Sequence, residues 1–169
     1  VLTFRHDTCN VLVMERDKPS QETKGNDMTM TIHQANLGAL SGGIKPNCGP
    51  TAVANLIGQK TRSVMDMFRS EFGYAGNWQG RSYMEQCLNI LKKNGQSPKT
   101  MGNERGRMSR KMALKGFVDM HCKSKGRYFI RVGGHFVVII DQVVYDQHEI
   151  APISKSKCAR KMVTHAFEV

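Results

Sequence analysis

One segment in the second half of the chain restricts the fold more than any other, Gly133-Gly134-His135-Phe136-Val137-Val138-Ile139-Ile140. Two glycines precede a run of β-branched and aromatic residues, a pattern typical of a buried strand. Comparable runs bounded by turn residues occur at 127–132, 143–149 and 162–169. The second half of the chain is therefore predicted to form an antiparallel sheet, in which the strand that starts at His135 continues to residue 141.

Helical patterns come before these strands. Apolar residues recur at helical spacing in 51–59, 61–72 and 82–94. Pro50 suits the first turn of the first helix, where an N–H would have no acceptor within the helix. A short basic helix is also predicted at 109–116. Helices followed by strands indicate an α+β fold with segregated layers, in which N-terminal helices pack on a C-terminal antiparallel sheet.

The beginning of the chain is more polar. A short strand is predicted at 11–14, a loop at 17–27 and a second loop at 38–47. We therefore expect an N-terminal extension over residues 1–30 and one folded domain over residues 31–169. No apolar run approaches the length of a membrane span, and the first residues lack the apolar core of a signal peptide. These features predict a cytoplasmic protein without a membrane span.

Cys48 stands at the start of the first helix, in Asn47-Cys48-Gly49-Pro50. The helix dipole and the free N–H groups of the first turn lower the pKa of a thiol at this position, and the thiolate is the nucleophilic form. The same N–H groups can hold an oxyanion. The position predicts a nucleophilic cysteine, and the alternative is an inert cysteine buried at a helix start.

The other cysteines are Cys9, Cys87, Cys122 and Cys158. The total is odd and the spacings are wide, so no disulfide framework is predicted. Cys9, Cys87 and Cys158 are expected to act as small apolar core residues. Cys122 follows a histidine, but a zinc site needs about four ligands at short paired spacings, which the sequence lacks. We expect neither a metal nor another cofactor.

A thiol nucleophile needs a base, and His135 is the predicted one. It is a polar ring at the mouth of an intensely apolar strand, and the two glycines before it allow a substrate or another backbone to come close. A third group should orient the imidazole ring. The acids that follow in the sequence are Asp141, Asp146 and Glu149.

The geometry of a hairpin selects one of these acids. If residues 141–142 form a two-residue turn, Ile140 faces Val143. Counting outward from the turn makes Asp146 the diagonal neighbour of His135 on the same face of the sheet, within reach of a polar side chain. The acid in the turn itself would lie at the far end of the strand. Asp146 is therefore the predicted partner of His135.

These motifs together resemble a known family. A Cys-Gly-Pro helix start at 48–50, then Gly-His-Phe-Val-Val-Ile at 134–139 and an acid on the next strand, is similar to the papain-like cysteine peptidases. The likeness is greatest to the compact domains that process bacteriocin leader peptides and to related small bacterial and phage proteins. It covers roughly residues 34–150.

The resemblance implies a papain-like fold and a catalytic triad of Cys48, His135 and Asp146. It also implies cleavage of a peptide, isopeptide or related amide bond in a protein or peptide substrate, through a thioester and without a cofactor. An acyltransferase is a variant, in which an amine resolves the same thioester. A phage-encoded member would work in the host cytoplasm.

One position departs from the family pattern. The family usually has a glutamine six residues before the cysteine, whose side chain donates to the oxyanion, but this chain has Gly42 there. The nearest upstream amides are Gln34 and Asn36, and we expect the glycine-rich loop to fold one of them into this role. Loss of an oxyanion donor costs about 10²–10³ in rate. An inactive scaffold that serves only for binding is therefore the second hypothesis.

The chain carries a formal net charge of +11. Residues 91–131 contain twelve Lys and Arg against Glu104 and Asp119, a local excess of +10. Such a stretch favours an anionic partner, either an acidic protein or nucleic acid, although a merely solvated face has the same composition. Aromatic residues make up 7%, few for stacking on bases. The residues expected to contact this partner are Lys92, Lys93, Arg105, Arg107, Arg110 and Lys111.

Overall fold

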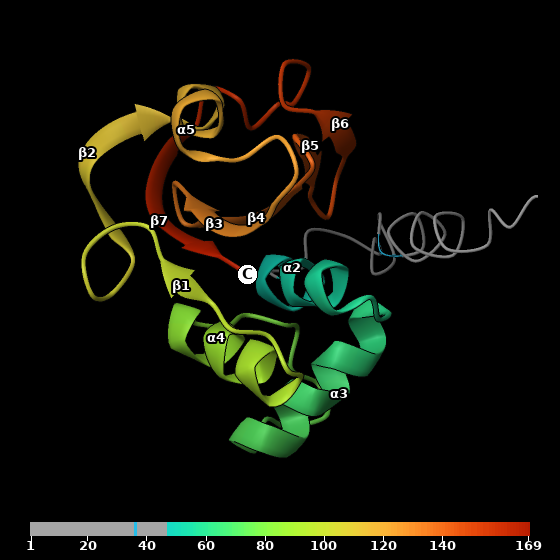
Figure 1. Ribbon diagram of the computed structural model, residues 1–169. Coiled ribbons are helices and arrows are strands. Elements are labelled where there is room, and N and C mark those ends of the chain that lie inside the picture. Colours follow the sequence, from blue (N-terminus) through green and yellow to red (C-terminus); the bar gives the residue numbers. More distant parts are fainter. Residues whose placement is uncertain (1–35, 37–46) are drawn as a thin grey trace, which may run out of the picture.

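The computed structural model describes Asn36 and residues 47–169 (Figure 1). Within residues 47–169 the helices are α2 (Cys48–Ile57), α3 (Thr61–Phe72), α4 (Met84–Lys93) and α5 (Leu114–His121). The strands are β1 (Lys99–Thr100), β2 (Arg107–Ala113), β3 (Arg127–Val132), β4 (His135–Ile140), β5 (Val143–Tyr145), β6 (Ile150–Pro152) and β7 (Met162–Glu168). The predicted α+β architecture of helices and an antiparallel sheet is confirmed.

The strands form one antiparallel sheet in the spatial order β1-β7-β3-β4-β5-β6. The remaining strand, β2, pairs with β7 on the same side as β1. As a result β7 lies between β3 and the two strands β1 and β2, although it comes after all of them in the chain. The hairpins β3–β4 and β4–β5 form the middle of the sheet and position the residues around His135.

Both faces of the sheet are covered. Helices α2, α3 and α4 lie on one face and α5 lies on the other (Figure 1). The alternation of side chains along β4 sends Phe136 and Val138 into the core beneath α2–α4, and Val137 and Ile139 into the core beneath α5. A strand buried on both faces must be apolar at every position, which explains the unbroken run from 136 to 139.

The predicted basic helix at 109–116 is wrong. Residues 107–113 form β2, which pairs with β7, and the helix α5 begins only at Leu114. The apolar residues that hold α5 on the sheet are Leu114, Phe117 and Val118, all fully buried at helical spacing. The basic side chains of β2 are exposed, so they do not hold this segment in place, and its backbone pairing with β7 decides its structure.

The hairpin register is confirmed, whereas the length of its second strand is not. Ile140 faces Val143 as predicted, and both turn residues 141–142 have positive φ, as a two-residue type I′ turn requires. The predicted strand 143–149 is interrupted after residue 145, where the Asp146 N–H donates to the Glu149 carbonyl. This turn sends the chain back along β5 as β6.

Several predictions for the N-terminal part lie outside the described residues. They concern the strand at 11–14, the loop at 17–27, nearly all of the loop at 38–47, the boundary between residues 30 and 31, and Cys9. In the part of the chain that the structure describes, no helix has both the length and the apolar character needed to cross a membrane.

Candidate active site

Cys48 is the first residue of α2, as the sequence predicts. The helix closes its first turn with the Thr51 N–H, which donates to the Asn47 carbonyl at 3.0 Å. The N–H groups of the first turn have no acceptor within the helix, so they are free to stabilise a negative charge. The Cys48 side chain is half-buried and lines a cleft of about 890 Å³.

Gly49 lets the start of α2 pack closely against its neighbours. A Cβ atom at this position would lie 2.0 Å from Ser82 Oγ and 3.0 Å from Cys87 Sγ. It would also lie 3.4 Å from the ring of Phe136, which belongs to the strand that carries His135. The absence of a side chain at 49 therefore brings the helix that carries Cys48 close to β4.

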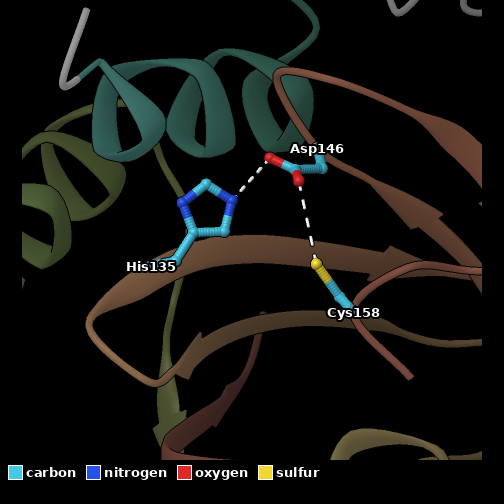
Figure 2. Close-up of side chains that lie close together, drawn as sticks. All are labelled: His135, Asp146 and Cys158. Carbon is cyan, nitrogen blue, oxygen red and sulfur yellow. Dashed lines mark hydrogen bonds and ion pairs between the residues drawn. The ribbon is translucent and has the colours of Figure 1, made fainter. Parts of the chain in front are cut away.

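His135, the first residue of β4, is paired with Asp146. The distance from His135 Nε2 to Asp146 Oδ1 is 2.7 Å, and the aspartate is 6% exposed. Figure 2 shows Nε2 directed at the carboxylate while the other ring nitrogen points away from it. The Gln147 N–H also donates to Oδ1, at 2.5 Å, and the Cys158 thiol donates to Oδ2, at 3.8 Å. The structure thus brings together the histidine and the acid that the hairpin count selected.

The charges of His135 and Asp146 stabilise each other. Burial lowers the pKa of His135, but the hydrogen bonds and charges of Asp146 and Cys48 outweigh burial and raise this pKa to about 9. Burial raises the pKa of Asp146, but the hydrogen bond and charge of His135 bring it below its ordinary value. At neutral pH the ring is therefore an imidazolium and the acid a carboxylate.

Cys48 is the second partner of the ring. Burial raises the pKa of Cys48, but a hydrogen bond with His135, the Phe136 backbone N–H and the charge of His135 together lower it below its ordinary value. Because Nε2 is bonded to Asp146, Nδ1 is the ring nitrogen that remains for the thiol. The arrangement favours a thiolate–imidazolium pair beside the cleft.

The other described cysteines differ from Cys48. Burial raises the pKa of Cys87 to about 12 and that of Cys122 also to about 12. Burial, reinforced by the charge of Asp146, raises the pKa of Cys158 as well. Cys87 and Cys158 are buried, as predicted for small core residues. Among the four described cysteines, Cys48 is the one whose pKa is lowered.

One group of side chains has potential metal ligands. Atoms of His135, Asp146 and Cys158 lie within 4.8 Å of one another (Figure 2). Zinc sites generally use four ligands, and this group supplies three. Asp146 already forms hydrogen bonds with both of the others, His135 and Cys158. The geometry therefore fits a hydrogen-bonded chain better than a metal centre.

Of the two expected oxyanion donors, the structure describes only Asn36, and it lies away from Cys48. Gln34 lies outside the described residues. Asn36 is 2% exposed and lies at the opposite end of α2, where its Nδ2 donates to Asn55 Oδ1 at 3.0 Å and to the Gln59 carbonyl at 2.8 Å. Its Oδ1 accepts the Thr61 N–H at 2.8 Å. The prediction for Asn36 is wrong, because its amide joins the end of α2 to the start of α3.

The basic residues chosen from the sequence do not form one surface. Arg105 and Arg107 line the cleft that contains Cys48. Arg110 and Lys111 are exposed further along β2, and Lys92 and Lys93 are exposed on α4. Two further arginines of the cleft, Arg81 and Arg131, were missed. The position of Arg131 could have been predicted from the two strands on either side of Gly133-Gly134. A hairpin turn at these glycines places Arg131 opposite Phe136, next to His135.

Comparisons with protein-family models, with curated proteins and with solved structures found no match to this chain.

Proposed function

We propose that this protein is a papain-like thiol hydrolase that cleaves a peptide, isopeptide or related amide bond. One arrangement carries the proposal: His135 is hydrogen-bonded through Nε2 to the buried Asp146 carboxylate and also contacts Cys48, whose pKa it lowers. A nucleophile, a base and a group that orients the base are the parts that covalent acyl transfer needs. Cys48 also stands at a helix start that opens on a cleft.

The residues have complementary roles in this scheme. The Cys48 thiolate attacks the carbonyl carbon, and the oxyanion is stabilised by N–H groups of the first turn of α2. His135 gives its proton to the leaving amine as the C–N bond breaks, which leaves a thioester. His135 then takes a proton from water, whose oxygen attacks the thioester; the C–S bond breaks, which releases the acid and restores the Cys48 thiolate beside the imidazolium. Asp146 holds the ring and stabilises the imidazolium.

The pH dependence of Cys48 reactivity tests the proposal. In the wild type, alkylation by iodoacetamide should already be fast at neutral pH, because the pKa of Cys48 is lowered. In His135→Asn the hydrogen bond and charge of the ring are lost while burial remains, so the pKa of Cys48 should rise above its ordinary value. The measurement is the alkylation rate at each cysteine, mapped by mass spectrometry between pH 5 and 10.

Hydrolysis is tested with a pool of peptides of mixed sequence, analysed by mass spectrometry. New termini should form with the wild type and not with Cys48→Ala. A Cys48 that reacts no faster than a thiol of the unfolded chain, together with an intact peptide pool, would reject the proposal and leave a scaffold that serves for binding.

A further inference from the structure

Arginines gather in the cleft beside Cys48. Arg81, Arg105, Arg107 and Arg131 line it, together with the two acids Glu85 and Glu104. These arginines come from three parts of the chain: the segment before α4, the segment from β1 into β2, and β3. Their convergence gives the cleft an excess of positive charge.

Two of the arginines belong to a row that crosses the sheet from the candidate nucleophile outward. Phe136, whose backbone N–H contacts the Cys48 sulfur, faces Arg131 on β3. Arg131 faces His165 on β7, and His165 faces Arg107 on β2. Residues directly opposite on neighbouring strands share a face of the sheet. The row therefore continues from Cys48 along one wall of the cleft.

The charges of this row are not neutralised within the described residues. Arg69, Lys93, Lys115 and Lys123 each form an ion pair with an acid, but none of the four cleft arginines does. Arg131 packs over the ring of Phe136, and its Nε is buried without a hydrogen-bond partner in the described residues. Burial, reinforced by the charges of Arg131 and Arg107, lowers the pKa of His165, which supports the closeness of these groups.

We propose that the cleft selects an acidic peptide, whose carboxylates pair with Arg131 and Arg107. This inference rests on the proposed function, because it takes the cleft as the place where the substrate binds. The guanidinium group suits carboxylates, which it can bind through two N–H groups. Glu85 and Glu104 in the same cleft offset two of the four arginine charges, and the remaining two positive charges match two carboxylates of a peptide substrate.

The geometry also gives a spacing. Neighbouring strands lie about 4.8 Å apart, so Arg131 is roughly 5 Å and Arg107 roughly 14 Å from Phe136 along the row. An extended peptide advances about 3.4 Å per residue. A substrate that follows the row from the scissile bond beside Phe136 therefore places one acidic residue one or two positions away and another about four positions away, both on the same side of the bond.

Binding of two capped hexapeptides tests the inference. Fluorescence anisotropy of labelled hexaglutamate and hexaglutamine measures affinity without any need for catalysis. Hexaglutamate should bind more tightly, and its affinity should fall by about fivefold in Arg131→Gln and in Arg107→Gln, the upper range for an exposed ion pair. It should fall further at 0.5 M NaCl. Hexaglutamate should also protect Cys48 from iodoacetamide, whereas hexaglutamine should not.

Two variants serve as controls. Arg62→Gln removes the same charge from an exposed position on α3 outside the cleft, and it should leave the affinity unchanged. Arg131→Lys keeps the charge but loses the planar guanidinium, so its affinity should lie between those of the wild type and Arg131→Gln. This second control separates the loss of charge from a loss of packing on Phe136.

The outcomes distinguish the two proposals. Equal binding of the two hexapeptides, or loss of binding only in Arg62→Gln, overturns the acidic-peptide inference while a reactive Cys48 still supports a hydrolase. Selective binding of hexaglutamate beside an unreactive Cys48 rejects the hydrolase and supports the arginines as a site for acidic peptides. Labelled hexathymidylate, a short single-stranded DNA, is measured in the same assay. If it binds more tightly than hexaglutamate and loses affinity in Arg131→Gln and Arg107→Gln, the inference is overturned in favour of a nucleic-acid ligand.

Discussion

His135 is the residue on which the chemistry of the candidate site depends. Its two ring nitrogens face two different acids, the Asp146 carboxylate and the Cys48 thiol, and both favour the protonated ring. Because the pKa of His135 is raised from 6.5 to about 9, protonated His135 stabilises the folded protein fully below about pH 6.5. This stabilisation is lost as the pH rises through about 9.

Asp146→Asn should lower the pKa of His135. The hydrogen bond and the charge of the carboxylate raise this pKa, and without them burial acts in the opposite direction. Titration of the imidazole by NMR should therefore show a midpoint well below 9 in the variant. Asp141→Asn changes an acid of the hairpin turn, which accepts the Gly126 N–H, and it should leave the midpoint near 9. An unchanged midpoint in Asp146→Asn would contradict the pairing.

At the scale of elements, α2 is held at both of its ends. Its first turn packs closely on Ser82 and Cys87 because residue 49 has no side chain. Its last turn is tied to α3 by the buried Asn36 amide. The contacts at Gly49 set the position of Cys48, whereas the hydrogen bonds of Asn36 lie at the other end of the helix, seven or more residues from Cys48.

Gly49→Ala should destabilise the protein by roughly 1–3 kcal/mol, the usual cost of overpacking. The added methyl would lie 2.0 Å from Ser82 Oγ, so the double variant Gly49→Ala with Ser82→Ala should recover part of the loss. Gly76→Ala is a matched control, because a Cβ there meets nothing within 4 Å. Thermal melting of the four proteins is the measurement, and an equal loss for Gly76→Ala would contradict this packing.

Asn36→Ala should reduce stability and leave the chemistry of Cys48 unchanged. Removal of the amide takes away the acceptor of the buried Thr61 N–H and a donor to the Gln59 carbonyl, at a cost of about 1–3 kcal/mol. The rate of iodoacetamide alkylation at Cys48, measured well below the melting temperature, should equal that of the wild type. Asn77→Ala, at an exposed position, is the control for stability. An unchanged melting temperature together with slower alkylation of Cys48 would instead support a role for Asn36 in the candidate active site.

At the scale of the whole molecule, two cores share one sheet. The core beneath α2–α4 supports Cys48, and the core beneath α5 contains Val137 and Cys158, which flank His135 and Asp146. The site therefore depends on both layers. The strand β7 joins them, because it contributes Phe167 to the first core and Ala166 to the second.

Ala166→Asp should unfold the protein or lower its stability by several kcal/mol, because it buries a carboxylate without a partner in a fully enclosed position. The enhanced alkylation of Cys48 should disappear with the fold. Met162→Asp introduces the same charge in the same strand at a side chain that is 46% exposed, and it should be tolerated. Circular dichroism and alkylation of both variants are the measurements. A folded Ala166→Asp protein of normal stability would contradict the burial of Ala166 in the core beneath α5.

Features that depend on neighbours along the chain could be predicted. The helix start at Cys48 follows from Pro50 and the apolar spacing after it, and the burial of β4 follows from its unbroken apolar run. The proximity of His135 and Asp146 could also be found from the sequence, because a two-residue turn determines which residues of a hairpin face each other. The period of two along a strand extends that register to Tyr145, the residue directly before the acid.

Tertiary structure decided what local sequence leaves open. Residues 107–113 become a strand because β7 offers them unpaired backbone groups, and β7 is about fifty residues away in the chain. Asn36 lies at the far end of α2 because its amide hydrogen-bonds the Gln59 carbonyl and the buried Thr61 N–H there. Arg107 and Arg131 come to one wall of the cleft only when β2, β7 and β3 pair. The sequence by itself thus determined the helix start, the buried strand and the hairpin that pairs His135 with Asp146, whereas long-range pairing determined what surrounds them, since its energy comes from residues far apart in the chain.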